Sequence, residues 1–470
     1  MPKPFYITTT LPYVNGEPHI GFALEIVEAD VIARFNRILG NEVFFNTGTD
    51  EHGMKIYRKA EEEGKTAQQY VDEMSVPFKN LKELLNISYT NFIRTTDVHH
   101  IEAAQEFWRR CEKNGDIYKK EYKTKYCIGC ELEKTDSELV DGRCPIHPSR
   151  EIEIRQEENY FFRFSKYQQQ LLDLYAAQPD FVVPEKRMNE IRSFVSSGLN
   201  DFSISRLKSK MPWGVPVPGD EDHVMYVWFD ALVNYISALG WPATGNFEKF
   251  WPSVQIAGKD NLRQQSAMWQ AMLLSAGLPH SKQILINGFI DVNGQKMSKD
   301  LGNVISPKEL VSKYGIDGTR YILLNLANLG DDSDASMKRF DDSYQADLAN
   351  GLGNLVSRVL KLSEKLSSPF VPAHSDGFAS EFLDLMNRYR FADALRFVVA
   401  IVDSSNKRIN DTKLWELVKT NPTQFEAIMH ELLADIATIA HHLTPFLPET
   451  SEKIKTALKL GKTEILFPRV

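Results

Sequence analysis

The stretch Leu11–Phe22, LPYVNGEPHIGF, limits what this chain can fold into more than any other segment. A β-branched and aromatic run before it, Phe5–Thr10, predicts a buried strand. After it, apolar residues recur at helical spacing until Gly40, where a helix is expected to end. A strand, a Pro-, Asn- and Gly-rich turn and a helix are typical of an α/β sheet whose turn faces an anion, usually phosphate. His19 would add a donor to that turn, and a surface histidine in an ordinary loop is an equally good interpretation of this stretch alone.

Composition limits the number of domains, the cellular compartment and the partners that are expected for this chain. Its 470 residues are 43% hydrophobic and 25% charged, which suits several domains with sizeable cores. No run approaches the roughly 20 apolar residues of a membrane helix, and the early strand leaves no room for a signal peptide. Four cysteines make no disulfide framework in a chain of this length, so we expect a cytoplasmic protein with no membrane partner. The net charge of −8 argues against a nucleic acid partner unless basic residues are concentrated locally.

A carboxylate follows the second predicted strand. The strand Glu42–Asn46 runs into Thr47–Gly53 and places Asp50 near its carboxyl end, the edge at which open α/β sheets bind ligands. A carboxylate there suits an ammonium group or a ribose hydroxyl. The N-cap of the next helix is an equally good interpretation.

A cysteine and histidine pattern marks an insertion in the sheet. Two residues separate Cys127 from Cys130, and two separate Cys144 from His147, which is the spacing of a tetrahedral zinc knuckle. Three thiolates and one imidazole fill the coordination shell, so we expect one structural zinc ion per chain. A redox pair is the alternative for a single CxxC motif, and the second pair disfavours it.

The α/β pattern resumes after Asp222. A strand and turn are predicted over Gln255–Asp260, and a further strand over Gln283–Asn287. Trp228 and Tyr235, at the start of this part, either belong to the core or line an apolar ligand pocket.

Two lysines, Lys296 and Lys299, bracket Met-Ser after the last of these strands. A cationic loop flanked by glycines can close over a polyphosphate as charge develops on it, although such a pair is more often simply solvated. Beyond Ser306 the chain is predicted to be helical, with breaks at Leu366–Pro372 and around Pro445, so the last third is expected to form a bundle of about five helices.

Taken in order, these segments resemble a class I aminoacyl-tRNA synthetase, and more narrowly the methionyl-tRNA synthetase family, across essentially the whole chain. The segments that carry the resemblance are Leu11–Gly21, Gly48–Gly53, the cysteine and histidine knuckle, Tyr226–Ala231, Gly258–Asp260, Lys296–Lys299 and Asn354–Arg358. The resemblance implies an α/β protein with a Rossmann-type parallel sheet domain, interrupted by a zinc-knuckle insertion and followed by an all-α helix-bundle anticodon-binding domain. The implied boundaries are 1–115 for the first half of the catalytic domain, 116–222 for the connective insertion, 223–305 for the second half with the KMSK loop, 306–349 for a stem-contact region and 350–470 for the anticodon-binding domain.

The resemblance implies a methionine–tRNA ligase that works in two steps. The carboxylate of L-methionine attacks the α-phosphorus of ATP and releases pyrophosphate, which leaves methionyl-adenylate. The terminal ribose hydroxyl of tRNA(Met) then attacks the carbonyl. Neither step strongly needs a protein nucleophile, so catalysis would depend on positioning and charge stabilisation, with Mg²⁺ accompanying ATP.

Matching positions give each site residue an implied role. The catalytic residues would be His19, Lys296 and Lys299. ATP would be bound by these three with Gly21, Gly258, Asp260 and Ile290. Methionine would be bound by Leu11, Tyr13, Asp50, Trp228, Ala231, Tyr235, Asn261 and Gln265. The anticodon CAU would be read by Asn354, Arg358 and Trp415, through stacking and polar contacts to unstacked bases. Basic residues in the insertion and the bundle would then contact RNA phosphates in spite of the negative net charge.

The chain departs from the family pattern in three places. Phe22 stands where the family usually has a second histidine, and Asp300 where it usually has serine. After Asp260 the family commonly carries an apolar residue, an aromatic residue and a histidine beside the methionine pocket. This chain has Asn261, Gln264 and Gln265 there. We therefore expect altered efficiency or selectivity rather than loss of function.

Two other functions stay open. One is a class I synthetase for another apolar amino acid, although the insertion is too short for the editing domain that leucine, isoleucine and valine enzymes generally carry. The other is a catalytically weakened tRNA-binding paralogue, which Phe22 and Asp300 suggest and the retained His19, Asp50 and Trp228 disfavour. The chain ends soon after the predicted bundle, without the C-terminal oligonucleotide-binding domain that dimerises some relatives, so a monomer is expected.

Overall fold

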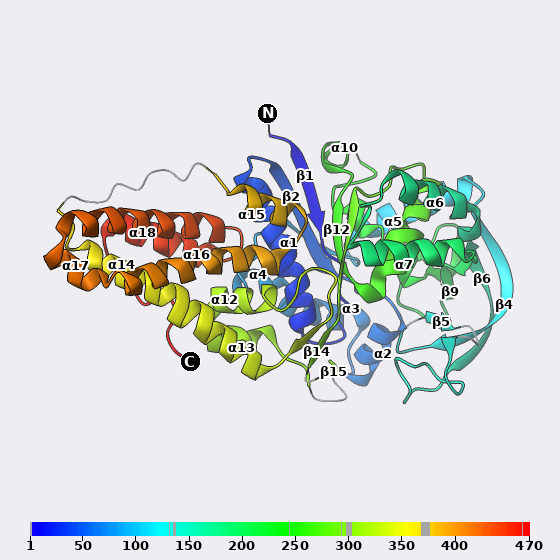
Figure 1. Cartoon of the computed structure of the whole chain (residues 1–470). Coiled ribbons are helices and arrows are strands. Elements are labelled where there is room, and N and C mark those ends of the chain that lie inside the picture. The colour runs from blue at the N-terminus through cyan, green and yellow to red at the C-terminus, as the bar shows by residue number, and fades with distance from the viewer. Residues whose placement is uncertain are drawn as a thin grey trace. The chain divides into compact units, whose positions relative to one another are not determined.

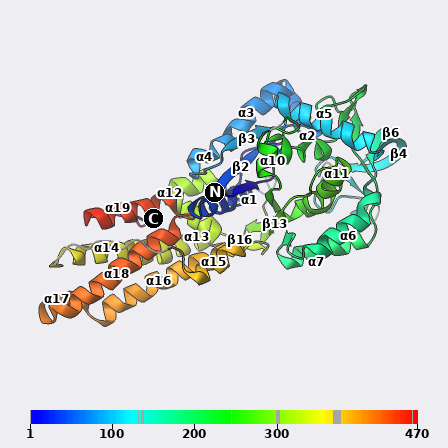
Figure 2. The same cartoon turned by 90° about the horizontal axis from the view of Figure 1, so that it is seen from above.

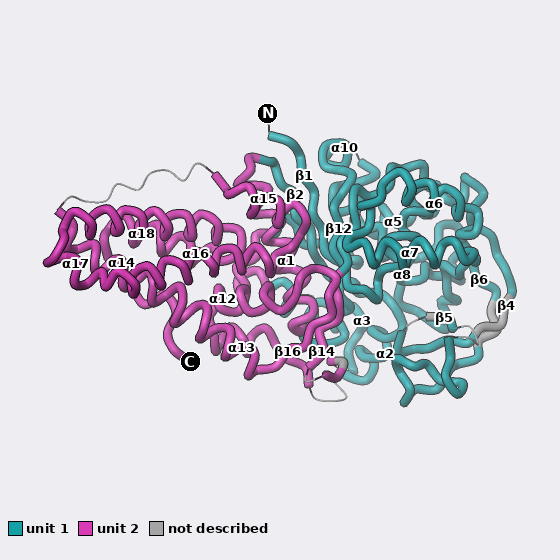
Figure 3. The backbone as a smooth tube through the Cα atoms, viewed as in Figure 1, with its two compact units in different colours: residues 1–17, 41–80, 89–286 teal, residues 18–40, 81–88, 287–470 magenta. Residues whose placement is uncertain are grey.

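The chain forms two compact units, each assembled from separate segments (Figure 3). The computed structural model describes residues 2–130, 132–134, 138–243, 245–292, 294–297, 303–367, 377–462 and 464–470. Unit 1 comprises residues 1–17, 41–80 and 89–286, and unit 2 comprises residues 18–40, 81–88 and 287–470. The chain passes from one unit to the other between Glu17 and Pro18, inside the stretch Leu11–Phe22.

Unit 1 is built on a six-stranded sheet in the order β3-β2-β1-β12-β13-β7. Figure 1 labels β1, β2 and β12 of this sheet. The pairs β1–β2, β2–β3, β1–β12 and β7–β13 are parallel, as the α/β pattern predicts. The strands are β1 Pro4–Thr8, β2 Glu42–Thr49, β3 Asn91–Arg94, β7 Val182–Val183, β12 Val254–Gly258 and β13 Gln283–Asn287, whose last residue is counted with unit 2. The sequence predicts β1, β2, β12 and β13, but not β3 and β7, because four and two residues give no readable alternation.

Helices of unit 1 pack around an aromatic core. On α5 the buried residues Ala103, Ala104, Phe107, Trp108 and Cys111 recur at helical spacing and make one apolar face. Phe107 stacks on Trp269 of α11, with ring centroids 5.5 Å apart. Figures 1 and 2 both show α6 and α7 side by side. The helices of this unit are α2 Met54–Glu62, α3 Ala67–Lys79, α5 Val98–Lys113, α6 Gln168–Ala177, α7 Glu185–Ser196, α8 Val227–Ala231, α9 Asn234–Ser237, α10 Asn246–Phe250 and α11 Trp269–Ser275.

Unit 1 also contains the segment expected to be the insertion, residues 116–222, which includes α6, α7, the sheet strand β7 and most of two antiparallel sheets. One sheet has the order β5-β4-β6-β8 and a smaller one the order β10-β11-β9. The strands are β4 Ile117–Cys127, β5 Leu132–Lys134, β6 Glu153–Phe162, β8 Phe202–Ser203, β9 Ser205–Leu207, β10 Pro216–Val217 and β11 Asp220–Met225. β4 and β6 pair over most of their length, and β4 ends at the first knuckle cysteine.

Unit 2 combines the helix that follows His19 with the helical last third of the chain. Its helices are α1 Ile20–Ile38, α4 Leu81–Leu84, α12 Pro307–Leu324, α13 Met337–Ser343, α14 Asn354–Ser363, α15 Ser380–Asn387, α16 Phe391–Asp411, α17 Leu414–Thr420, α18 Pro422–Leu443 and α19 Pro448–Leu460. Its strands form a small sheet in the order β15-β14-β16, with β14 Ile290–Val292, β15 Gln295–Lys296 and β16 Ser333–Ala335. α16 and α18 lie side by side in both Figure 1 and Figure 2, and the predicted helical character of this part is confirmed.

A buried ion pair ties α1 to α12 within unit 2. Arg320 Nη2 lies 2.8 Å from Asp30 Oδ2, and both side chains are fully buried. Burial opposes ionisation of Asp30, but Arg320 and Arg34 outweigh it and lower the pKa of this carboxyl. The position of α1 in unit 2 therefore depends on a partner far along the chain.

Candidate active site and metal centre

Asp50 lies at the carboxyl end of β2, against the segment that carries Tyr13. Its backbone N–H donates to Pro12 O at 3.0 Å and Val14 N–H donates to Asp50 O at 3.3 Å, so Tyr13 and Asp50 form an isolated parallel bridge. Asp50 is 4% exposed, and the N-cap of the following helix α2 is Gly53. The helix-cap interpretation of Asp50 is therefore excluded, and the ligand-binding edge of the sheet remains.

The residue after Asp50 fixes this strand end. Glu51 is fully buried, and its carboxylate accepts hydrogen bonds from Arg94 at 2.7 and 2.9 Å, from Thr49 Oγ1 at 2.6 Å and from Thr96 Oγ1 at 2.5 Å. A bidentate arginine and two hydroxyl donors are the conditions under which a buried ion pair is tolerated. The backbone beside Asp50 is consequently held in one position.

A second buried carboxylate connects the same strand end with α8. Asp230 Oδ2 lies 2.6 Å from His52 Nδ1, and Asp230 Oδ1 lies 2.8 Å from His100 Nε2, whose Nδ1 lies 2.9 Å from Ser237 Oγ. Burial opposes ionisation of Asp230, but the two imidazoles outweigh it and lower the pKa of Asp230 to about 2. This cluster was not predicted from the sequence. The signal in the sequence was proximity to expected pocket residues. His52 stands two residues after Asp50, and Asp230 stands two residues after Trp228.

Tyr235 and Gln265, both expected beside the methionine side chain, are in contact. Gln265 Nε2 donates to Tyr235 Oη at 2.5 Å, and Tyr6 Oη donates to the backbone O of Tyr235 at 2.9 Å. The Oε1 atoms of Gln264 and Gln265 and the Nε1 atom of Trp228 are buried and make no hydrogen bond to the described residues. Burying a polar atom without a hydrogen-bond partner is costly, so these atoms are suited to hydrogen bonds with a bound ligand or water.

The end of β12 carries the other expected residues of unit 1. Gly258 is its last residue, and Asp260 and Asn261 follow in a short 3-10 turn, with Asn261 Nδ2 3.4 Å from Asp260 Oδ1. A Cβ on Gly258 would lie 2.8 Å from Asp260 Oδ1. Glycine therefore lets the exposed carboxylate lie over the strand end, within reach of a polar ligand. Ala231 is buried on α8.

His19 caps the N-terminus of α1 in unit 2. Gly21 N–H donates to His19 Nδ1 at 3.0 Å, and a Cβ on Gly21 would lie 2.8 Å from the His19 ring. Because Nδ1 accepts this bond, the neutral imidazole carries its proton on Nε2, which is a donor at the positive end of the helix. Glycine at position 21 is required for this cap. The geometry favours the anion-facing interpretation of His19 over that of an ordinary surface histidine.

Met297, which belongs to the second signature segment (residues 288–304, with Lys296 and Lys299), lies near the same end of α1. Met297 Cε lies 3.9 Å from the position that a Cβ on Gly21 would take, and Ile20 N–H donates to Ile305 O at 3.1 Å. The side chain of Lys296 and the whole of Lys299 and Asp300 lie outside the described residues.

Phe22 and Ile290 are both 8% exposed, one on α1 and the other at the start of β14. A phenylalanine ring offers no hydrogen-bond donor. The first signature stretch, Leu11–Phe22, thus offers a single imidazole, from His19.

Cys127, Cys130, Cys144 and His147 come together as predicted. Their ligand atoms all lie within 4.8 Å of one another, with Cys130 Sγ 3.4 Å from Cys144 Sγ and 3.3 Å from His147 Nδ1. Tetrahedral bonds of about 2.0–2.3 Å place the ligands of a zinc ion about 3.5–3.8 Å apart, so these donors fit such an ion. A Cβ on Gly129 would lie 2.4 Å from His147 Cγ, so glycine lets the imidazole close the cluster.

The three residues expected at the anticodon lie on two helices of unit 2. Asn354 and Arg358 are one turn apart on α14, and Arg358 Nη2 donates to Asn410 Oδ1 of α16 at 2.8 Å. Trp415 lies on α17 and is 44% exposed. Such a ring offers a face on which a base can stack.

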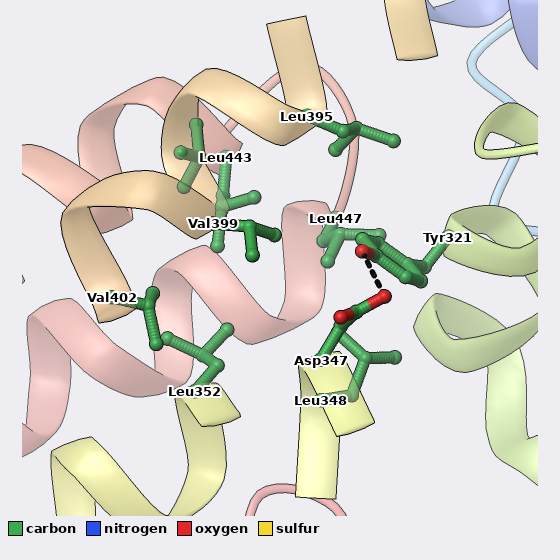
Figure 4. A pocket seen from close by; sticks show the side chains of 10 residues that line it. Tyr321, Asp347, Leu348, Leu352, Leu395, Val399, Val402, Leu443 and Leu447 are labelled. Carbon is green, nitrogen blue, oxygen red and sulfur yellow. Dashed lines mark hydrogen bonds between the residues drawn. The ribbon is translucent and has the colours of Figure 1, made fainter. Parts of the chain in front are cut away.

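A small cavity in the helices of unit 2 is not a candidate site. It holds about 10 Å³ between apolar side chains, beside the hydrogen bond of 2.8 Å from Tyr321 Oη to Asp347 Oδ2 (Figure 4). A volume of about 10–15 Å³ holds one water molecule and no substrate.

Comparison with known proteins places this geometry in a family. The family model described as "tRNA synthetases class I (M)" matches residues 5–152 and 133–360. The methionine–tRNA ligase of Nostoc sp. is 43% identical, over 98% of this chain and 90% of that protein. The methionine–tRNA ligase of Thermotoga maritima is 42% identical, over 96% of this chain and 74% of that protein.

Solved structures agree with the sequence comparison. The Mycobacterium tuberculosis methionyl-tRNA synthetase in complex with methionyl-adenylate superposes with a TM-score of 0.89 at 38% identity, covering 96% of this chain and 93% of that one. The apo form of the same enzyme gives a TM-score of 0.85 at 32% identity, covering 100% and 99% of the two chains. Among the described residues, every helix is too short or too polar to cross a membrane.

Proposed function

The chain belongs to the methionyl-tRNA synthetase family of class I aminoacyl-tRNA synthetases, and from this premise we propose how its residues share the reaction. It is a methionine–tRNA ligase, which activates L-methionine with ATP and transfers the methionyl group to tRNA(Met). The observation on which our residue assignment chiefly rests is the bridge between Tyr13 and Asp50, which joins a buried carboxylate to the first signature stretch.

Methionine is assigned to residues of unit 1. Asp50 and the backbone of Leu11 bind its ammonium group, because a buried carboxylate at the edge of a parallel sheet suits a cation. The side chain is bound by Tyr13, Trp228, Ala231, Tyr235, Asn261 and Gln265. The aromatic character of this set supports the assignment, since a thioether gains from contact with aromatic rings.

ATP is assigned to residues at the ends of α1 and β12 and on the second signature segment. His19 donates its Nε2 proton to a phosphate oxygen at the helix N-terminus next to Gly21. The ribose is bound by Gly258 and Asp260, the adenine lies near Ile290, and the phosphates also contact Lys296 and Lys299.

The two steps then follow from positioning and charge. An oxygen of the methionine carboxylate attacks the α-phosphorus, the bond from that phosphorus to the bridging oxygen breaks, and pyrophosphate leaves with the electron pair. His19 and the lysines stabilise the charge that develops, and Mg²⁺ bound with ATP supplies further positive charge. The tRNA ribose hydroxyl next attacks the methionyl carbonyl carbon, and AMP leaves.

We propose that the Cys3His cluster holds one structural zinc ion. Because Gly129 leaves room for the His147 ring, Gly129→Ala should displace that ligand and reduce zinc retention severalfold. Elemental analysis of freshly purified protein should find about one zinc per chain before the change. Ile146→Ala is the matched control, because Ile146 lies between two ligands but is 53% exposed. Absence of zinc from the unchanged protein would contradict the site, and full retention in Gly129→Ala would contradict the role of the glycine.

The tRNA contacts are assigned to the insertion and to the helical part of unit 2. Residues 1–115 and 223–305 form the catalytic domain in this proposal, 116–222 the connective insertion, 306–349 a stem-contact region and 350–470 the anticodon-binding domain. Asn354, Arg358 and Trp415 read the anticodon, and the exposed Trp415 ring supports this. A cytoplasmic location fits the four free cysteines, of which three belong to the metal cluster and Cys111 is buried. The monomeric state stays a prediction.

ATP–pyrophosphate exchange with each of the twenty amino acids tests the assignment. We expect exchange with methionine alone, in spite of Phe22 and the glutamines near the pocket. Exchange with another amino acid instead would reassign the substrate, and silence with all twenty would favour a tRNA-binding paralogue. Reactions without amino acid provide the background rate.

A further inference from the structure

Two hydrogen bonds attach Asn287 and Ile305, the residues that flank the second signature segment (residues 288–304), to α1. At its start, Asn287 Nδ2 donates to Glu28 Oε2 at 2.5 Å. At its end, Ile20 N–H donates to Ile305 O at 3.1 Å. Ile20 and Glu28 lie eight residues apart on one helix, which separates the two attachment points by about 12 Å along its axis. The helix that carries His19 at its N-terminus thus also holds both residues that flank this segment.

The first attachment point is a buried acid. Glu28 is 2% exposed and Asn287 is 6% exposed. Burial raises the pKa of Glu28 to about 8, with the Asn287 hydrogen bond opposing and the charge of Glu25, one turn earlier on α1, adding to the rise. At neutral pH Glu28 is therefore mostly a neutral acid, which accepts the asparagine bond without burying a charge.

Other charged groups of α1 and α12 have partners of their own. Asp30 pairs with Arg34 and Arg320 and accepts a hydrogen bond from Ser88 N–H. Asp317 Oδ2 accepts from Thr450 N–H at 2.6 Å. Glu25 is thus the titratable neighbour whose charge acts on Glu28.

We propose that Glu28 is a positioning residue for adenylate formation, which through Asn287 fixes where the second signature segment starts on α1. This inference rests on the proposed function, in which that segment carries two phosphate-binding lysines. Small displacements of positioned groups cost large factors in rate. When Glu28 loses its proton, the bond from Asn287 strengthens, but a charge is then buried beside Glu25. A shift of the Glu28 side chain away from Glu25 relieves that cost and displaces Asn287 with it.

The pH dependence of ATP–pyrophosphate exchange tests the proposal. Glu28→Gln keeps an acceptor for Asn287 and removes the proton. We expect kcat/KM for ATP to fall severalfold above about pH 8 in the unchanged enzyme and to lack this fall in Glu28→Gln. Glu452→Gln is the matched control and should keep the fall, because Glu452 lies on the surface of α19 and its ion pair with Lys455 is exposed.

A double-mutant cycle tests whether the bond itself carries the effect. Glu28→Leu and Asn287→Leu should each raise KM for ATP about tenfold at pH 7, leave methionine binding in the absence of ATP unchanged, and be no worse when combined. An unaltered alkaline fall in Glu28→Gln, or additive effects of the two leucine variants, would overturn the proposal. Glu28→Gln decides the matter if the leucine variants do not fold. Absence of exchange in the unchanged enzyme would instead contradict the proposed function itself.

Discussion

Replacing Asp50 with asparagine should lower kcat/KM for methionine in ATP–pyrophosphate exchange by about 100-fold or more. The substitution of Asp50 by asparagine removes one negative charge and keeps the shape of the side chain, so the backbone bridge to Tyr13 should persist. Removing one partner of a charge-assisted hydrogen bond to an ammonium group in a buried site costs about 3 kcal/mol. This free energy corresponds to a fall of about 100-fold in kcat/KM. ATP binding should be unchanged, because Asp50 is assigned to the amino acid alone.

The same substitution at a surface aspartate provides the control. Asp173 lies exposed on α6 and accepts a hydrogen bond from Gln169, so Asp173→Asn should leave both kinetic parameters and the unfolding temperature unchanged. An unchanged KM for methionine in Asp50→Asn would show that the carboxylate does not bind the substrate. A fall in activity accompanied by an equal fall in the unfolding temperature would assign Asp50 to the fold instead.

Local patterns explain which parts of this protein the sequence predicts. β1, β2, β12 and β13 contain short runs of apolar and β-branched residues, and the Cys3His cluster is defined by the two-residue spacing inside each of its pairs, so both signals are local in the sequence. The place of Asp50 at a strand end follows from the same local pattern. Its role was ambiguous between a helix cap and a ligand-binding residue. The structure excludes the helix cap, because Gly53 is the N-cap of α2, and the binding of a ligand by Asp50 stays a prediction.

The contacts that hold the candidate site could not be predicted in this way. Glu51 finds Arg94 on another strand, Asp230 joins two histidines from different elements, and Glu28 meets Asn287 across most of the chain. No periodicity marks such pairs, because each depends on how distant elements pack. The one local sign is a charged residue on an otherwise buried helix face, as at Glu28 on α1, and it shows that a partner is needed without identifying it.

Removing the carboxylate of Asp230 should have the largest effect on the stability of unit 1. Asp230→Ala leaves the rings of His52 and His100 buried without their acceptor, and loss of one member of a buried charged cluster costs about 3–5 kcal/mol. Ser237→Ala is the matched control. It removes only the other hydrogen-bond partner of His100 and should cost about 1 kcal/mol.

The pH dependence of this effect has a definite sign. Since the pKa of Asp230 is lowered from 3.8 to about 2, the folded state favours the ionised carboxylate, and its contribution is fully present above about pH 4. As the pH falls toward 2 the contribution disappears, and it amounts to about 2 kcal/mol over that range. The stability difference between the unchanged protein and Asp230→Asn should therefore narrow between pH 4 and pH 2. A difference that does not vary with pH would show that the charge of Asp230 is not what stabilises the cluster.

Hydrogen exchange connects this stability with catalysis. Asp230 joins α8, which carries Trp228, to His52, two residues after Asp50, so its loss should release the strand end as well as the helix. We expect Asp230→Asn to lower amide protection across Thr49–Gly53 and to raise KM for methionine about tenfold, with a smaller change in KM for ATP. Protection lost evenly through unit 1 would mean that Asp230 stabilises the unit as a whole. Protection lost at the strand end alone would mean that the cluster holds Asp50 in its binding position, and that the two histidines of this site act on methionine through that aspartate.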